Sequence, residues 1–439
     1  MLRTLRDAFK IKDLRKKLLF TFLMLVVVRL GSQLPIPGVN RNYFTQWFAS
    51  QQANGAFNFF SAFTGGSFER MSIFALNITP YITSSIIMQL LTIAIPQLEE
   101  MQRDGDDGRK KIQKITRYLT VGLALFESIA MAIGFGRQGL IENMNFLNTI
   151  TVIVALTAGS AFLMWVGERI TEKGIGNGIS IVLMINILSR VPQDISTLIN
   201  QFVTSQSNIA KAGVALIIIL AVIVATIILV IILNDAIRRI PVQYAKKVQG
   251  RKLVGGQSSH IPLKVNTAGV IPVIFASSLM SIPQIITSFV GKTPSGVFGT
   301  ILGMLNQNNW FNFRAPVYSI GLILYVVLII FFAYFYTSIT FNPIEVADNM
   351  KKQGGFIPGI RPGKPTTEYL NKILGYIIFI GAVGLTIVVL VPVFFNGVFH
   401  ASVSFGGTSI IIIVSVILET IKQIESQMVV RNYKGFLND

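Results

Sequence analysis

Residues able to carry enzymatic chemistry are few in this sequence and lie far apart. It contains two histidines, His260 and His400, and no cysteine, so disulfides and thiolate metal sites are excluded. Because the charge distribution along the chain places the two histidines on opposite sides of a membrane, they are not expected to share a metal ion or a catalytic triad. The stretch PGIRPGKPT (358–366) resembles a phosphate-binding loop only superficially, since proline follows Lys364 where serine or threonine is required. We therefore expect no enzyme activity, no metal and no cofactor.

The composition indicates that these few groups belong to a membrane protein. Hydrophobic residues make up 52% of the chain and charged residues 13%, whereas an ordinary soluble domain has about 25% charged residues. The uncharged run VALIIILAVIVATIILVIIL (214–233) rises about 1.5 Å per residue as a helix and so matches a hydrocarbon core of about 30 Å.

Runs of this kind predict ten transmembrane helices. They lie near residues 18–34, 71–95, 118–136, 150–166, 179–189, 214–233, 268–290, 317–341, 373–395 and 401–418. The fifth run is short, and we expect Arg190 and Pro192 to end it. Because lipid offers no hydrogen-bond partner to an exposed backbone, the expected fold class is an all-α polytopic membrane protein.

Basic residues are concentrated on one side of the predicted membrane. Of the 38 Lys and Arg residues, 30 fall in the segments 1–17, 97–117, 167–178, 234–264, 342–372 and 419–439. The positive-inside rule places these segments, and therefore both termini, in the cytosol. Within the spans only Arg29 and Glu127 are charged, whereas ion-coupled transporters usually set several charges inside the bundle.

Six stretches with polar or helix-interrupting residues are the most distinctive part of the sequence. They are LPIPGVN (34–40), FALNITPYITSSIIMQLLT (74–92), GERITEKGIGNGISI (167–181), YAKKVQGRKLVGGQSSHIPLKVNTAGVIPVIFASS (244–278), FNPIEVADNMKKQGGFIPGIRPG (341–363) and FGGTSIIIIVSVI (405–417). In order and spacing, over nearly the whole chain, they closely resemble the SecY family, the large subunit of the bacterial protein-conducting channel. The resemblance implies two inverted five-helix halves, 1–205 and 206–439, around an hourglass pore.

The resemblance also implies that aliphatic side chains line the narrowest part of the pore. The matching positions are Ile78, Ile82, Leu183, Ile187, Ile274 and Ile412. A constriction that passes any polypeptide yet holds back ions should be apolar and yielding, without fixed charges. Each of these aliphatics judged alone could equally face lipid or the protein core.

The stretch GAFNFFSAFTGGS (55–67) is aromatic, uncharged and too short to cross a bilayer. In the family, a short re-entrant plug helix precedes the second span, which implies that residues 57–68 close the pore from outside. Its bulk would come from Phe57, Phe59, Phe60 and Phe63, while Gly65 and Gly66 can end a helix and act as a hinge. The composition alone also fits an ordinary interfacial aromatic loop.

A lateral gate toward lipid is implied between the second and seventh spans. These spans carry polar residues that a lipid-facing helix would avoid, namely Thr83, Ser84, Gln89, Asn266 and Ser277. Interhelical hydrogen bonds between such residues, worth about 0.6 to 2 kcal/mol each, would hold a gate shut and still let it open. Pro80, Pro272 and Pro283 are expected to interrupt the same two helices.

The cytosolic loops 234–264 and 342–372 are the implied docking sites for the ribosome or the SecA motor ATPase. Lys246, Lys247, Arg251, Lys252 and Arg361 offer charge to ribosomal RNA phosphates or to a protein carboxylate. The resemblance further implies a SecE subunit bracing both halves and a peripheral SecG subunit.

The resemblance leads us to expect a passive protein-conducting channel in the bacterial plasma membrane, whereas the residues alone indicate a polytopic helical bundle with interrupted helices. The channel would pass unfolded secretory polypeptides, and would release signal sequences and membrane segments sideways into membrane lipid. A secondary transporter with inverted repeats is the alternative, and it would need converging charges at the membrane midplane, which this sequence lacks. A membrane scaffold for a soluble ATPase would need the cytosolic loops but no pore.

Overall fold

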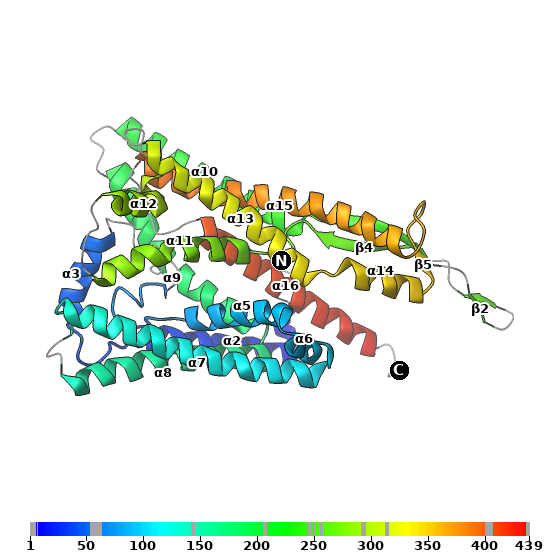
Figure 1. Ribbon diagram of the computed structural model, residues 1–439, viewed down its shortest axis with the longest axis horizontal. Coiled ribbons are helices and arrows are strands. Elements are labelled where there is room, and N and C mark those ends of the chain that lie inside the picture. The colour runs from blue at the N-terminus through cyan, green and yellow to red at the C-terminus, as the bar shows by residue number, and fades with distance from the viewer. Residues whose placement is uncertain are drawn as a thin grey trace.

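Long helices run roughly side by side, and a narrow β-hairpin projects beyond one end of them (Figure 1). The computed structural model describes residues 6, 8–52, 64–141, 145–204, 209–244, 247–249, 252–254, 258–290, 296–311, 316–399 and 407–435. In Figure 1 the blue and cyan helices of the first part of the chain lie along one side, and the green to orange helices of the second part lie along the other.

The part of the chain up to Thr204 supplies seven of the helices described and a π-helical turn. They are α2 (Lys12–Gly31), α3 (Arg41–Gln52), α5 (Thr79–Ala94), α6 (Pro96–Arg103), α7 (Asp106–Arg137), α8 (Phe146–Lys173), α9 (Gly178–Ile199) and η1 (Asn200–Thr204). The second part contains α10 (Ile209–Asp235), α11 (Ile271–Val290), α12 (Val297–Leu305), α13 (Ile320–Thr340), α14 (Pro343–Lys352), α15 (Lys364–Phe399) and α16 (Gly407–Gly435), with 3₁₀ turns η2 (Gln307–Asn309) and η3 (Pro316–Ser319).

Each of the ten predicted spans overlaps one helix, namely α2, α5, α7, α8, α9, α10, α11, α13, α15 and α16. Within the described residues, six helices are long and apolar enough to cross a membrane alone, and α5 with α6 makes a seventh if this pair, bent by 107°, counts as one span. Fewer than ten helices meet this criterion. One reason is that α5 has only 16 residues, and another is that α2 begins with several basic residues, which make it less apolar. The chain is a mostly helical membrane protein with several apolar spans.

Two of the predicted spans were wrong in extent. Residues 65–78 form turns, and the second span is helical only from Thr79, where Pro80 stands at a position that favours helix initiation. The fifth helix, α9, does not end at Arg190 but continues through Pro192 to Ile199. Pro80, like Pro272 at the second residue of α11, therefore begins a helix and does not interrupt one, whereas Pro283 does lie inside α11.

The two cytosolic loops predicted as separate segments meet in a β-sheet, which the sequence analysis did not anticipate. Antiparallel strands β1 (Ile237–Tyr244) and β4 (Ser258–Lys264) pair from Ile237 with Lys264 to Gln243 with Ser258. The short strand β5 (Gly355–Phe356), from the second loop, pairs with the end of β1 and completes the order β4-β1-β5. Beyond it, β2 (Lys247–Gln249) and β3 (Lys252–Val254) form the outer part of the hairpin.

Alternating side chains fix the sheet against the helices next to it. Ile240 and Val242 on β1 are buried with Leu263 on β4, in one cluster with Met350 of α14 and Leu370 of α15. Because side chains alternate between the two faces of a strand, residues two apart in β1 share the buried face. The hairpin thus starts from a rigid base formed by both loops.

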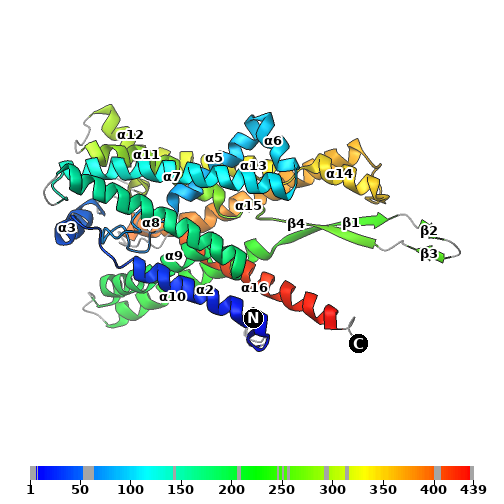
Figure 2. The same ribbon diagram turned by 90° about the horizontal axis from the view of Figure 1, so that it is seen from below.

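Different helices and strands lie at the two ends of the bundle. Figure 2 shows α2 beginning, α16 ending and the hairpin projecting at one end, with α14 also there, whereas α3 and α12 lie at the other. The main hydrophobic core lies between these ends and draws buried residues from both parts of the chain, among them Val28, Leu183, Tyr325 and Ile411.

Candidate functional site

The six residues predicted to form a constriction belong to one hydrophobic cluster. Ile78, Leu183, Ile187 and Ile412 are buried in it, and Ile82 and Ile274 are partly buried against it. They come from α5, α9, α11 and α16, and therefore from both parts of the chain. Ile78 stands just before α5, and its carbonyl oxygen accepts a hydrogen bond from the Ile82 N–H at 3.0 Å. The cluster has many other members, so the assignment of these six as a pore ring stays a prediction.

The predicted plug is described only at its far end. Phe57, Phe59, Phe60 and Phe63 lie outside the described residues. Gly65 and Gly66 have φ of 61° and 82°, in the left-handed region that glycine adopts without a steric penalty. Gly65 also packs against α9 so closely that a Cβ there would collide with the main-chain carbonyl oxygen of Asn186. These two glycines are required for the turn itself and, at Gly65, for its contact with α9.

A buried ion-pair cluster lies beside this turn and was not predicted from the sequence. Arg190 of α9 donates through Nη2 to Oε1 of Glu69 at 2.6 Å, and its Nε lies 3.6 Å from Oδ1 of Asp194 one helical turn on. The Arg190 and Asp194 side chains are 6% and 8% exposed. A basic residue inside an apolar helix with a carboxylate four residues later was a usable signal, because such a pair lies on one helix face. The sequence analysis expected Arg190 to end the fifth span, but Arg190 lies buried within α9.

The predicted gate residues find partners in different directions. Thr83 and Ser84 donate to the carbonyls of Thr79 and Pro80, at 3.0 and 2.7 Å, and so bond within α5. Asn266 donates to Asn234 of α10 at 3.0 Å, and Ser277 shares a 2.8 Å hydrogen bond with Tyr325 of α13. The sequence analysis had expected hydrogen bonds between α5 and α11. The hydrogen bonds of these four residues run elsewhere, so that expectation was wrong for them.

Gln89 is the exception among the five gate residues. Its side chain lies next to the Tyr336 hydroxyl, and so α5 approaches α13 at this point. α5 belongs to the first predicted half of the chain and α13 to the second. Gln89 is therefore the gate residue whose described contact crosses between the predicted halves.

The predicted docking residues lie at the hairpin end of the bundle. Arg361 is exposed in the turn between β5 and α15, and its carbonyl accepts a hydrogen bond from Thr366 Oγ1 at 2.9 Å. Gly359 and Gly363, with φ of 82° and 105°, bracket the turn. The backbones of Lys247 and Lys252 lie in β2 and β3, while Lys246 and Arg251 lie outside the described residues.

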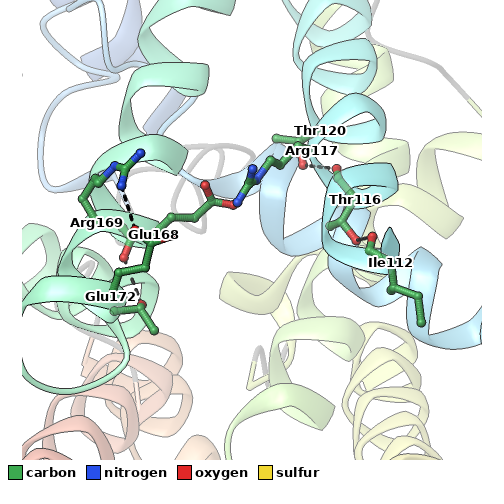
Figure 3. Close-up of polar contacts among 9 residues, drawn as sticks. Ile112, Thr116, Arg117, Thr120, Glu168, Arg169 and Glu172 are labelled. Carbon is green, nitrogen blue, oxygen red and sulfur yellow. Dashed lines mark hydrogen bonds and ion pairs between the residues drawn. The ribbon is translucent and has the colours of Figure 1, made fainter. Parts of the chain in front are cut away.

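An interhelical ion pair ties α7 to α8 near the same end of the bundle (Figure 3). Arg117 Nε donates to Glu168 Oε1 at 2.6 Å, and these side chains are 44% and 19% exposed. In Figure 3 the Glu168 side chain extends from α8 toward α7, while Arg169 pairs with Glu172 on its own helix at 2.8 Å. The Arg117–Glu168 pair fastens two neighbouring helices of the first part of the chain.

Comparison with known proteins identifies the architecture. The SecY family model matches residues 72–421. Protein translocase subunit SecY of Streptomyces scabiei is 45% identical over 453 residues, and that of Bacillus subtilis strain 168 is 41% identical over 450; each alignment covers all of both chains.

Solved channels share the fold at lower identity. A SecY structure, whose plug domain is described as stabilising the closed state of the translocation channel and maintaining a membrane seal, superposes with a TM-score of 0.63 at 19% identity, covering 94% of this chain and 92% of its own. Sec61 from a canine ribosome-channel complex of the endoplasmic reticulum gives 0.58 at 17%, covering 94% and 93%.

Full-length relatives at this identity decide between the function classes that the sequence analysis kept open. They favour a multi-pass bacterial membrane protein that conducts polypeptides over a secondary transporter, a scaffold or an enzyme. The chain belongs to the SecY family, whose members are the protein-conducting subunits of the protein translocase.

Proposed function

We propose that this chain conducts unfolded secretory polypeptides through an hourglass pore between two inverted halves, residues 1–205 and 206–439. The observation that carries the proposal is the single apolar cluster that brings Ile82 and Ile187 together with Ile274 and Ile412, drawn from both halves. Aliphatic side chains present no fixed charge to a passing polypeptide and can exclude ions by dewetting when the pore is empty. Ile78, Ile82, Leu183, Ile187, Ile274 and Ile412 form the constriction.

The plug closes the outer side of this constriction. Residues 57–68 form it, and support comes from the turn at Gly65 and Gly66, which brings the chain against α9 directly beside Ile187 in sequence. The related SecY structure, with a plug domain that maintains a membrane seal, also favours this reading. Closure from outside leaves the ring free to fit around a polypeptide once the plug has moved.

The lateral gate opens between α5 and the pair formed by α11 and α13. Gln89, which lies next to the Tyr336 hydroxyl, supplies a polar neighbour across this boundary. Four further polar residues lie on or beside the gate helices, namely Thr83, Ser84, Asn266 and Ser277. Each forms its hydrogen bond within its own part of the chain and not across the gate. Signal sequences and membrane segments leave through this gate into membrane lipid.

The driving partner docks on the hairpin end. The sheet β4-β1-β5 joins both loops, so a partner that binds one loop also acts on the other through the sheet. Exposed Arg361 presents a planar guanidinium in the turn between β5 and α15, and Lys246, Lys247, Arg251 and Lys252 add positive charge to the 234–264 loop. The ribosome and the SecA motor ATPase are the proposed partners, since a structural neighbour comes from a ribosome-channel complex. SecE and SecG complete the channel in the plasma membrane, with both termini cytosolic.

Reconstitution tests the proposal. The chain with SecE, placed in vesicles with SecA, ATP and a secretory precursor, should protect the precursor from external protease in an ATP-dependent manner. Vesicles with SecE but without this chain are the control. Protection that does not require the chain, or that is absent when SecA hydrolyses ATP normally, would contradict a conducting role.

A further inference from the structure

The segment from Thr64 to Ile78 passes through the core as a series of turns. Its middle is held by backbone hydrogen bonds from Ile36 N–H to the Met71 carbonyl at 3.1 Å and from Ile73 N–H to the Leu34 carbonyl at 3.0 Å. Because turns lack the regular backbone bonds of a helix, side-chain contacts add to these bonds in fixing the segment. Asn77 and Met71 adopt φ of 53° and 44°, in the left-handed region. Non-glycine residues keep such angles only where surrounding contacts determine them.

The strongest of these contacts is the ion pair between Glu69 and Arg190. Its N···O distance is 2.6 Å, and the two side chains are 17% and 6% exposed. At this burial the charges are poorly screened by water, so the Arg190 guanidinium compensates the charge of the Glu69 carboxylate. Asp194 also faces Arg190 from within α9, so the guanidinium retains a carboxylate even when Glu69 is neutral.

Three further hydrogen bonds act at the two ends of the same segment. Asn186 Nδ2 donates to Asn77 Oδ1 at 2.9 Å, and Ser160 of α8 donates to the Asn77 carbonyl at 3.1 Å. At the other end Ser189 Oγ donates to the Gly65 carbonyl at 3.4 Å. Asn186, Ser189 and Arg190 follow one another closely on α9, so this helix holds the segment at its start, middle and end.

We propose that the Glu69–Arg190 ion pair is the positioning contact that holds residues 64–78 against α9. The inference rests on the proposed function in one respect: if residues 57–68 are the plug, this contact sets where the plug ends and how firmly it stays in place. Because Glu69 lies within the first turns after Gly65 and Gly66, the fixed part of the segment begins immediately beyond these glycines.

Thiol labelling tests the positioning without relying on channel activity. The chain has no cysteine, so Ser67→Cys, at a side chain that is 2% exposed, gives a single reporter in the segment. The complex with cysteine-free SecE is placed in nanodiscs, where both faces are accessible, and is treated with a membrane-impermeant maleimide. Glu69→Gln should speed labelling at residue 67 by about tenfold, because loss of a buried charge partner frees the segment to open locally.

Two controls separate a local release from general loosening. Ser128→Cys, on fully buried Ser128 of α7, should stay unlabelled with or without Glu69→Gln. Glu168→Gln removes the matched 2.6 Å ion pair, whose carboxylate is 19% exposed, and should leave labelling at residue 67 unchanged. Glu69→Asp, which keeps the charge, should label more slowly than Glu69→Gln and covers the case in which the glutamine variant does not fold.

Equal labelling at residue 67 in the parent, Glu69→Gln and Glu69→Asp, with residue 128 protected, would overturn the proposal. Equal acceleration by Glu168→Gln would overturn it too, since the effect would then be unspecific. The resting ion conductance of the same complexes distinguishes the positioning role of the Glu69–Arg190 pair from the role of the plug in the seal. Faster labelling with an unchanged conductance would support the positioning contact and contradict the plug's role in the seal, whereas a rise in both supports both.

Discussion

The hydroxyl groups of Ser277 and Tyr325 lie 2.8 Å apart in a buried hydrogen bond that joins α11 to α13. Phe275 and Phe332 stack between the same helices at 5.1 Å. Because both contacts lie within the second part of the chain, they make α11 and α13 a unit. The lateral gate proposed above would therefore separate this unit from α5, where Gln89 lies next to Tyr336.

Removing the polar side chain of Gln89 from this boundary should weaken the closed gate. Gln89→Ala should let a precursor with a defective signal sequence translocate several-fold faster, because a polar contact between helices in a membrane protein contributes about 0.6 to 2 kcal/mol. Ser277→Ala is the matched control: it should lower stability by about 1 kcal/mol or more through the unpaired Tyr325 hydroxyl, with unchanged signal selectivity. Protease-protection rates and thermal unfolding measure the two effects. Relaxed selectivity in Ser277→Ala but not in Gln89→Ala would place the gate elsewhere.

Gly65 and Gly66 should differ in their tolerance of a side chain. Both have positive φ, so alanine at either costs about 1 to 2 kcal/mol. Only at Gly65 does the new Cβ meet the Asn186 main chain, whereas at Gly66 its nearest neighbour is Glu69 Oε2 at 3.8 Å. Gly65→Ala should therefore unfold at a clearly lower temperature than Gly66→Ala. Equal melting temperatures would argue against the close packing of the segment on α9.

Arg361→Glu should impair SecA-driven translocation with little loss of folded protein. An exposed substitution away from special features usually changes stability by no more than about 0.5 kcal/mol, and Arg361 is exposed. Lys364→Glu makes the same charge change at an exposed residue one turn away and serves as the control. Normal transport by Arg361→Glu, or equal loss in both variants, would leave Arg361 as a general topology or lipid-contact charge.

The charge asymmetry predicts the topology of the chain. Reporters fused after Asp439 and within residues 342–372 should read as cytosolic, and a reporter near Asn306 should read as external. The structure agrees in placing α12, which ends just before Asn306, at the opposite end of the bundle from the hairpin. Finding Asn306 and the 342–372 loop on one side would remove the ten-span interpretation and the pore built on it.

Much of the helical framework was predictable because hydrophobic runs carry a strong signal in lipid. The run at 214–233 lies within α10, and each of the ten predicted spans overlaps a helix. Failures arose where local sequence and tertiary context disagree. Arg190 and Pro192 normally end an apolar helix, but Glu69, distant in sequence, compensates the buried guanidinium and α9 continues.

The sequence allowed candidate residues to be named, and their role as a site stays a prediction, but it did not give their contacts. Ile187 and Ile412 could be assigned to one constriction through family motifs, and they do share a cluster. Periodicity gave no warning that residues 237–244 and 355–356 would pair as strands, because strand β5 is only two residues long and its partner lies over 100 residues away. The hydrogen-bond partner of Ser277 is likewise set by helix packing, which cannot be predicted from a single sequence.

Single-channel conductance of the complex with SecE tests the central claim most directly, since it measures the seal itself. Deleting residues 57–68 should leave translocation active and raise resting ion leakage, while replacing Ile78, Ile187 and Ile412 together by glycine should leak more persistently, because it widens and hydrates the constriction. Single changes of these residues to valine or leucine should be nearly silent. If neither the deletion nor the triple glycine variant alters the resting conductance, these residues do not form the seal and the proposed pore is contradicted.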